Sequence, residues 1–173
     1  GEAFDKAARV LNIPYPGGPL LDKLAEEGNP EAYRFPKIHT EGKYDFSFSG
    51  LKTAVINQAH MLRQKGEEIR VADWSASLRK AVVDMLVDKT LAACRDTGAK
   101  SVALAGGVAS NRLLRREMER RGTKMGLKVY MPPVALCTDN AVMIGSAAFY
   151  RLMTDEPAPL SLNAQPSIRL IEE

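Results

Sequence analysis

The chain is poor in cysteine, in histidine and in long apolar runs, and each shortage excludes a class of protein. Its 2 cysteines are too few for a disulfide framework, so we expect a reducing, cytoplasmic setting. The 2 histidines, His39 and His60, stand alone and lack the spacing of metal ligands. The longest apolar run, residues 141–149, is far shorter than the roughly 20 residues that cross a bilayer, so we expect no membrane partner. We also expect no signal peptide, because no cationic segment followed by an apolar core opens the chain.

The remaining composition is that of a globular domain. Hydrophobic residues make up 45% of the 173 positions and charged residues make up 26%, which are ordinary proportions. The net charge of +3 allows an RNA partner but does not require one. This length fits one domain or one lobe of a larger enzyme. A helical pattern starts directly at Gly1 without a capping residue, so Gly1 is either a tag remnant or marks a cut inside a longer protein; the motif pattern described below favours the cut.

Hydrophobic periodicity predicts an α/β organisation in the second half of the chain. The expected helices cover residues 2–12, 19–27, 51–64, 75–97, 111–126 and 140–153, and the expected strands cover residues 44–49, 101–105 and 128–131. The strand–helix–strand–helix order after residue 100 predicts parallel pairing. The last helix is apolar almost all round over residues 141–148, which predicts that it is buried. We expect one domain over residues 1–153 and an extended tail over residues 154–173.

A glycine pair follows the expected strand at residues 101–105. The segment SVALAGGVASNRLL, residues 101–114, passes through Gly106 and Gly107 into a helix that begins near Asn111. Glycine lets a backbone approach a ligand closely, and a helix N-terminus presents free N–H groups to phosphates. The pattern is neither a Walker motif nor a dinucleotide fingerprint. A nucleotide-binding turn and a plain turn capped by Asn111 therefore fit these residues equally well.

Three carboxylates lie close to loops. Asp139, in the segment LCTDNA, precedes the last helix and is either a helix cap or a ligand for a cation; the local sequence favours the cap. Asp5 and Asp22 flank a Pro-Gly-Gly turn that contains Gly18. Ionised carboxylates accept hydrogen bonds, so both could bind sugar hydroxyls. Taken alone, these two residues are more typical of solvated surface acids.

The helix expected at residues 111–126 is rich in cations. Its 6 basic residues are Arg112, Arg115, Arg116, Arg120, Arg121 and Lys124. Such a helix could meet a phosphate backbone. However, Glu117 and Glu119 interrupt the series and can pair with it locally, which favours a solvated helix face.

Five motifs, in order along the chain, resemble one known family. GEAFDKAARVL, YPGGP, YDFSFSGLKTAV, AGGVASNRLLR and CTDNAVMI are together similar to the TsaD family, from Gly1 to about Tyr150 and more loosely over the tail. The resemblance implies the ASKHA fold of actin, sugar kinases and heat-shock ATPases, in which a nucleotide lies between two α/β lobes. This chain would form the C-terminal lobe, with strand–helix units and a helical insertion.

The resemblance also implies an activity. Members of the family are acyltransferases that transfer the threonylcarbamoyl group from threonylcarbamoyl-adenylate to tRNA. The acceptor is the adenosine that follows the anticodon of tRNAs reading codons that begin with A. The implied ligands and partners are a divalent metal (iron, Fe2+, or zinc), ATP or an adenylate, tRNA, and the proteins TsaB and TsaE.

Specific positions of this chain match the family's motifs. The positions that match adenylate or nucleotide contacts are Asp5, Gly18, Asp22, Gly106, Gly107 and Asn111. Asp139 matches a metal ligand. The family's other two metal ligands form an HxxxH motif in the N-terminal lobe, and this chain contains neither that motif nor the glycine-rich phosphate loop. We therefore expect two histidines from the missing lobe to complete the metal site, and we expect the chain to be inactive alone.

Two other functions compete with the transferase. A non-catalytic paralogue or scaffold subunit of the same complex need not keep Asp5, Asn111 and Asp139 together, which argues against it. A metalloprotease corresponds to the family's former name, O-sialoglycoprotein endopeptidase. A zinc protease would carry an H-E-x-x-H motif, which is absent from the sequence.

Overall fold

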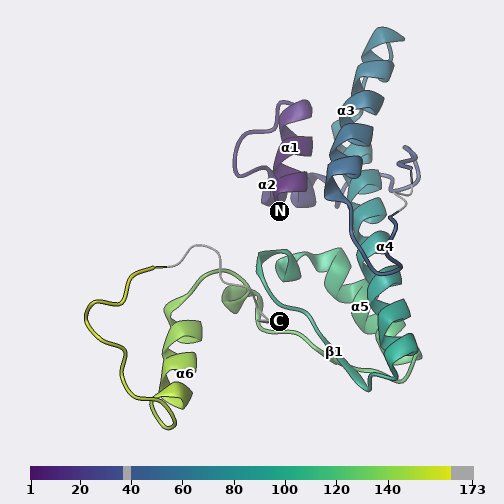
Figure 1. The fold of residues 1–173 in the computed structure, drawn as a ribbon. Coiled ribbons are helices and arrows are strands. Elements are labelled where there is room, and N and C mark those ends of the chain that lie inside the picture. Colours follow the sequence, from purple (N-terminus) through teal and green to yellow (C-terminus); the bar gives the residue numbers. More distant parts are fainter. Residues whose placement is uncertain (37–39, 165–173) are drawn as a thin grey trace. The chain divides into compact units, whose positions relative to one another are not determined.

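The computed structural model describes residues 1–36 and 40–164. Its elements in chain order are α1 (Glu2–Val10), α2 (Gly17–Leu24), α3 (Phe48–Gln64), α4 (Val71–Thr97), β1 (Ser101–Ala103), the 3-10 helix η1 (Gly107–Ser110), α5 (Arg112–Lys124), β2 (Lys128–Tyr130), the 3-10 helix η2 (Val134–Leu136) and α6 (Ala141–Arg151) (Figure 1). They belong to two compact units, Gly1–Thr138 and Asp139–Glu173. The expected boundary at residue 153 stays a prediction.

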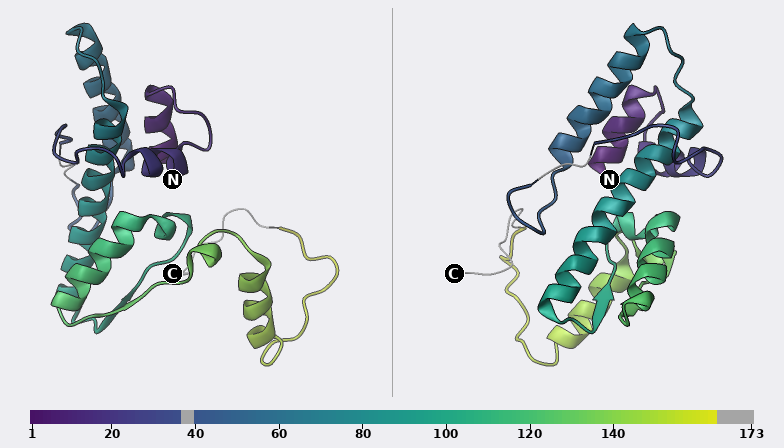
Figure 2. Two further views of the ribbon diagram at one scale, coloured as in Figure 1. Left: turned by 180° about the vertical axis from the view of Figure 1, so that it is seen from behind. Right: turned by 90° about the vertical axis from the view of Figure 1, so that its right-hand side faces the viewer.

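The first core of unit Gly1–Thr138 joins α1, α2, α3 and the first half of α4. Helix α1 packs on α2 and α3, and α2 packs on α4 (Figures 1 and 2). Residues 73–79 of α4 are buried without interruption, so neighbours surround the helix there. Trp74 is fully buried, and the edge of its ring system meets Phe35 at a centroid distance of 5.2 Å. Each large apolar side chain removed from water in this way stabilises the fold by about 1.5–3 kcal/mol.

The second core joins the other half of α4 to α5 and a small sheet. Val87 and Leu91 of α4 pack with Leu114 and Met118 of α5. Strands β1 and β2 run parallel, with Val102 opposite Val129. Because α4 contributes to both cores, it is the element that holds α2 and α5 in one unit. The predicted strand–helix–strand order and its parallel pairing are confirmed.

The strand expected at residues 44–49 is wrong. These residues form a turn followed by the start of α3, whose N-cap is Ser47. The Ser47 hydroxyl accepts a hydrogen bond from the backbone N–H of Gly50 at 3.4 Å. A serine cap favours a helix start, and no neighbouring strand pairs with this segment within the described residues. The alternating aromatics Phe46 and Phe48 instead stack on each other, with ring centroids 6.1 Å apart.

The burial expected for residues 141–148 is also wrong. Helix α6 is present, but none of its residues is buried, and Ile144 is 72% exposed. Apolar composition predicts burial only where a second apolar surface is available to cover the helix. Within the described part of its own unit, residues 139–164, α6 has no second helix or strand to pack against. None of the helices in the described residues is both long and apolar enough to span a bilayer.

Candidate functional site

Asp5 ties α1 to the beginning of α2. Its Oδ1 accepts a hydrogen bond from the backbone N–H of Gly18 at 3.0 Å, and the residue is half-buried. Gly17 makes the close approach possible, because an added Cβ would lie 2.4 Å from the Cβ of Ala8 and 3.3 Å from the Cα of Asp5. The Pro-Gly-Gly turn is therefore a tight packing contact between two helices, and Asp5 is not simply a solvated acid.

Asp22 lies one helical turn beyond Gly18, so the two residues share a face of α2. Its Oδ1 accepts two hydrogen bonds, one from Nδ2 of Asn111 at 2.7 Å and one from Nη1 of Arg79 at 3.0 Å. Within the described residues, its Oδ2 accepts none. Asp22 thus keeps one carboxylate oxygen available beside a helix face that Asp5 also reaches.

Asn111 has two roles in this arrangement. It is the N-cap of α5, where its Oδ1 accepts a hydrogen bond from the N–H of Leu114 at 2.9 Å, so the cap that the sequence left open as one of two interpretations is present. The cap fixes the orientation of the amide and directs Nδ2 to Asp22. An amide nitrogen carries two hydrogens, and only one of them is engaged by Asp22. A free donor of Asn111 therefore lies next to the free acceptor of Asp22.

Arg79 is the site residue that the sequence did not reveal. It lies on α4 with 7% of its surface exposed, and its guanidinium donates to the carbonyl oxygens of Asp22 and Ala25 at 3.1 and 3.0 Å. It also donates to Oε1 of Glu26 at 2.5 Å. This hydrogen bond holds the pKa of Glu26 below its usual value, and partial burial opposes the shift. Arg79 thereby joins the last turn of α2 to α4 and to the Asn111 cap.

Gly106 and Gly107 lie in a tight turn that precedes Asn111. Gly106 adopts φ +80° and ψ 171°, a conformation that is largely restricted to glycine. Gly107 opens the 3-10 helix that ends just before Asn111, and its carbonyl accepts a hydrogen bond from the Ser110 hydroxyl at 2.6 Å. Both glycines are exposed, and no hydrogen bond joins them to Asp5 or Asp22 in the described residues. Their predicted contact with a nucleotide stays a prediction.

Asp139 is not the cap of α6. The N-cap is Asn140, whose Oδ1 accepts a hydrogen bond from the N–H of Met143 at 3.0 Å. The cap interpretation that the local sequence favoured for Asp139 is therefore wrong. Asp139 is exposed and stands at the start of the second unit, directly after Thr138.

A comparison with protein families decides the relationship of the chain. A model of the TsaD family, described as tRNA N6-adenosine threonylcarbamoyltransferase, matches residues 1–146. The chain belongs to the TsaD family.

Curated TsaD relatives match over nearly the whole chain. A protein of Moorella thermoacetica named tRNA N6-adenosine threonylcarbamoyltransferase is 57% identical over 171 residues, which is 98% of this chain and 50% of the relative. A protein of the same name from Clostridium perfringens is 51% identical, over 99% of this chain and 51% of the relative. The chain therefore spans about half the length of the relatives that it matches.

The described residues of this chain do not supply enough ligands for the metal expected of a TsaD protein. No group of three or more His, Cys, Asp or Glu side chains suited to a metal ion occurs among residues 1–36 and 40–164. His60 is exposed on α3, and His39 lies outside the described residues. Asp139 can supply one carboxylate, but an iron or zinc site takes three or more protein ligands. The described residues do not by themselves fit the metal.

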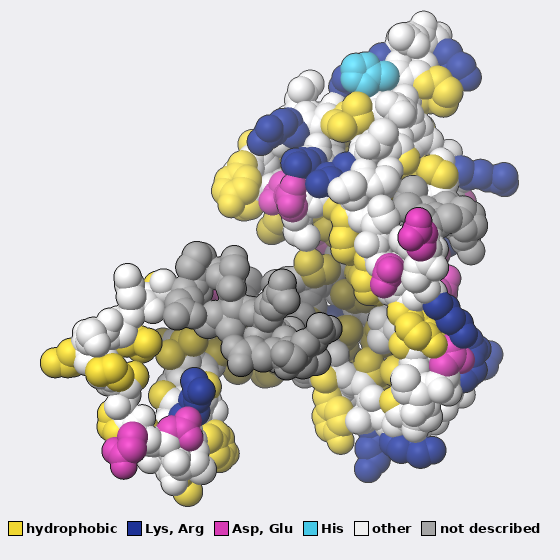
Figure 3. Space-filling model, in the orientation of Figure 1, with side chains coloured by type: hydrophobic (Ala, Val, Ile, Leu, Met, Phe, Trp, Pro, Cys, Tyr) yellow, Lys and Arg dark blue, Asp and Glu magenta, His cyan; other side chains and the backbone are white. Residues whose placement is uncertain are grey.

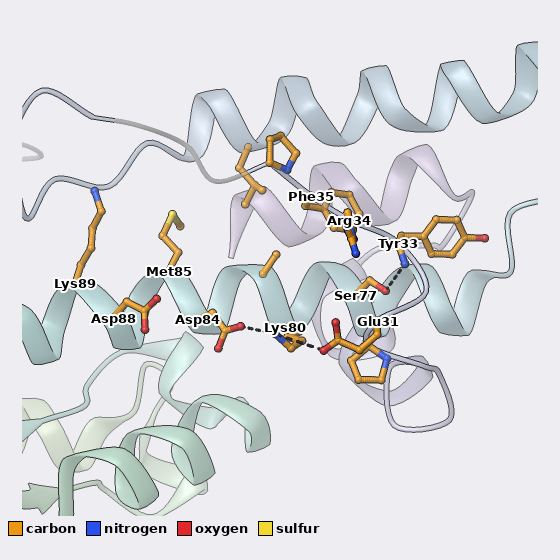
Figure 4. A pocket seen from close by; sticks show the side chains of 14 residues that line it. Glu31, Tyr33, Arg34, Phe35, Ser77, Lys80, Asp84, Met85, Asp88 and Lys89 are labelled. Atoms are coloured by element: carbon orange, nitrogen blue, oxygen red, sulfur yellow. Dashed lines mark hydrogen bonds and ion pairs between the residues drawn. The ribbon is translucent and has the colours of Figure 1, made fainter. Parts of the chain in front are cut away.

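The TsaD chain also has a cavity that is separate from the cluster of Asp5, Gly18, Asp22 and Asn111. A hollow of about 340 Å³ lies between α4 and the segment 30–36 (Figure 4). Ser77 and Lys80 of α4 line it, together with Phe35 and Met85, and Lys80 pairs with Asp84 at 2.7 Å. None of the predicted contact residues lines this cavity. It is therefore distinct from the cluster formed by Asp5, Gly18, Asp22 and Asn111.

Proposed function

We propose that this chain forms the adenylate-binding part of a tRNA N6-adenosine threonylcarbamoyltransferase and is inactive without the rest of that enzyme. The observation that supports this most directly is the cluster of Asp5, Gly18, Asp22 and Asn111. These residues come from three separate motifs, yet hydrogen bonds and one shared helix face join them. A scaffold subunit would have no need of an open donor and acceptor at this point.

The chemistry of the cluster suits a sugar with neighbouring hydroxyls. The free Oδ2 of Asp22 can accept a hydrogen bond from one hydroxyl, while the second N–H of Asn111 donates to the oxygen of the next. Arg79 keeps the Asp22 carboxylate oriented and balances its charge. The ribose of threonylcarbamoyl-adenylate carries such a pair of hydroxyls, and we assign it to Asp22 and Asn111.

The reaction that follows is an acyl transfer. The exocyclic amine of the tRNA adenosine attacks the carbamoyl carbonyl carbon, the bond to the phosphate oxygen breaks, AMP leaves, and the amine loses a proton. The cluster contributes by holding the adenylate in one orientation, because fixing two reactants at attack distance lowers the barrier. Cys137 is buried and Cys94 is buried, so no exposed thiol suggests a covalent intermediate, and we favour direct transfer.

The remaining parts of the enzyme lie outside the described residues. We propose an ASKHA-type cleft in which a second lobe faces this one across the nucleotide. Asp139 would give one ligand to a divalent metal, iron or zinc, and two histidines of that lobe would complete the site. A metal bound there would polarise the carbonyl or orient the adenylate. TsaB and TsaE would be partner proteins of the whole enzyme, and a cytoplasmic location is proposed with it.

The ribose assignment is tested with Asn111→Ser in the protein at the full length of its relatives. Serine keeps the helix cap but removes the amide donor, so the fold should persist. Loss of one hydrogen bond should weaken the binding of threonylcarbamoyl-adenylate roughly 2- to 10-fold in calorimetry, which corresponds to about 0.5–1.5 kcal/mol. Asn57→Ser, on the exposed side of α3, is the matched control. Equal affinity of the two variants would contradict the assignment, and a wild-type protein that bound no adenylate would favour the scaffold.

A further inference from the structure

Helix α5 carries a row of cations on its outer side. At four-residue intervals along the helix stand Arg112, Arg116, Arg120 and Lys124, and all of them are exposed. Side chains separated by four residues are neighbours on a helix surface, so these cations form one continuous line. The opposite side of α5 is buried against α4 and β2. The row is therefore fixed in place by the second core.

The C-terminal end of this row, at Arg120 and Lys124, borders a hollow between α4 and α5. The hollow has a volume of about 560 Å³, and the charged side chains around it are Asp88, Arg95, Arg120, Arg121 and Lys124. Lys and Arg side chains gather over this end of the unit in Figure 3. Cations outnumber the single carboxylate in the lining, so the hollow favours an anion.

Internal ion pairs occupy only some of these cations. Arg121 pairs with Asp88 on α4, and Arg120 pairs with Glu117 at 2.6 Å. Arg95 has its closest carboxylate, Asp96, at 3.8 Å, and its side chain is 68% exposed. Arg112 and Lys124 form no ion pair within the described residues, whereas Arg116 lies 3.9 Å from a carboxylate oxygen of Glu117. Within the described residues, Arg112 and Lys124 thus remain unpaired and available to a partner, and the ion pair of Arg116 is long at 3.9 Å.

We infer that this surface, the basic groove formed by Arg95, Arg112, Arg116, Arg120 and Lys124, binds the phosphate backbone of the tRNA substrate. The inference rests on the proposed function and adds the surface on which the tRNA docks. Guanidinium groups match phosphate oxygens in pairs, and a row of them suits a polyanion better than a single small anion. A lipid surface fits less well, because a membrane-binding helix presents an apolar face outward, and α5 uses its apolar face in the core.

The test compares two double variants of the protein at the full length of its relatives. Arg95→Gln with Lys124→Gln removes two exposed cations of the hollow, and Arg9→Gln with Lys65→Gln removes two exposed cations elsewhere, so the net charge changes equally. Affinity for unmodified tRNA is measured by filter binding over a series of salt concentrations. The groove variant should bind tRNA roughly tenfold more weakly, and the magnitude of its salt slope should fall by about 2, one for each lost contact.

Two other readouts separate the groove from the active site. Adenylate affinity and the transfer rate at saturating tRNA should equal those of the wild type, because neither cation belongs to the Asp22 cluster. A groove variant with the salt slope of the control would overturn the inference even if transfer were normal. Loss of binding to phosphatidylserine vesicles without a change in tRNA binding would overturn it in favour of a lipid surface. Absence of transfer in a wild type that binds tRNA would instead count against the proposed function alone.

Discussion

At the scale of single residues, Arg79 carries more contacts of the candidate site than any predicted residue does. Its guanidinium meets two carboxylates, those of Asp22 and Glu26, and the backbone carbonyls of Asp22 and Ala25 at the end of α2. We predict that Arg79→Met destabilises the chain by about 3 kcal/mol. The substitution leaves the carboxylates of Asp22 and Glu26 without their cation, at a helix contact from which water is largely excluded. The value lies at the low end for a broken buried pair, since the side chains of Asp22 and Glu26 are 24% and 46% exposed. Urea unfolding followed by circular dichroism measures it.

The control for Arg79 is Arg9→Met on α1, which is exposed and should change stability by less than about 0.5 kcal/mol. Arg79→Lys should fall between the two, because lysine keeps the charge but cannot reach all four acceptors. Equal stability of Arg79→Met and Arg9→Met would show that the network contributes nothing to the fold.

The resemblance to the TsaD motifs indicates Asp5, Gly18, Asp22 and Asn111, whereas the local sequence alone favours solvated surface acids for Asp5 and Asp22. Neither indicates Arg79. A single arginine in a long helix is most often solvated, and its burial depends on α2 packing across α4, which is a long-range contact. The free energy of such a contact depends on partners more than 50 residues away, and local periodicity carries no information about them.

At the scale of elements, the contact between α1 and α2 depends on one glycine. We predict that Gly17→Ala destabilises the chain by about 1–3 kcal/mol, because its Cβ would lie 2.4 Å from the Cβ of Ala8 and neither atom can rotate away. Gly18→Ala is the matched control, since its Cβ would make ordinary contacts of 3.7 and 3.8 Å. The control should be neutral or up to about 1 kcal/mol more stable, because alanine favours a helix. Thermal unfolding of both variants checks the contrast, and similar losses in the two would contradict the packing argument.

Helix positions were predictable because 3.6-residue periodicity is a local property. Gly98 indicated the end of α4, because glycine readily adopts the left-handed conformation that Gly98 has at this helix end. The segment 44–49 shows the limit of that approach. Alternation of aromatic and polar residues is typical of a strand, but a strand requires a partner, and Ser47 supplies a helix cap instead. Local patterns thus predict a helix more reliably than they predict a strand.

At the scale of the whole molecule, burial could not be predicted for α6 from its apolar composition. Val142, Ile144 and Phe149 are all exposed, at 63%, 72% and 63%. The sequence of a helix indicates that it favours an apolar neighbour, but it does not indicate which part of a protein supplies that neighbour. The chain spans about half the length of its relatives, so its own described residues are not the whole set of surfaces against which such a helix can pack in a protein of that length.

The proposed metal site is also a property of the whole molecule rather than of this chain alone. Asp139 is the one candidate ligand that the family motif assigns to this chain, and no cluster of three ligands occurs in the described residues. We predict that the 173-residue chain keeps far less than one iron or zinc per molecule after desalting, whereas the protein at the length of its relatives keeps close to one.

In that longer protein, Asp139→Ala should remove the metal and abolish tRNA modification. It should leave α6 intact, because Asn140 and not Asp139 caps the helix. Asp155→Ala, which removes an exposed carboxylate at the other end of α6, is the control and should keep both metal and activity. Elemental analysis and circular dichroism on matched samples decide the outcome, and stoichiometric metal in the short chain would show that its own residues complete the site.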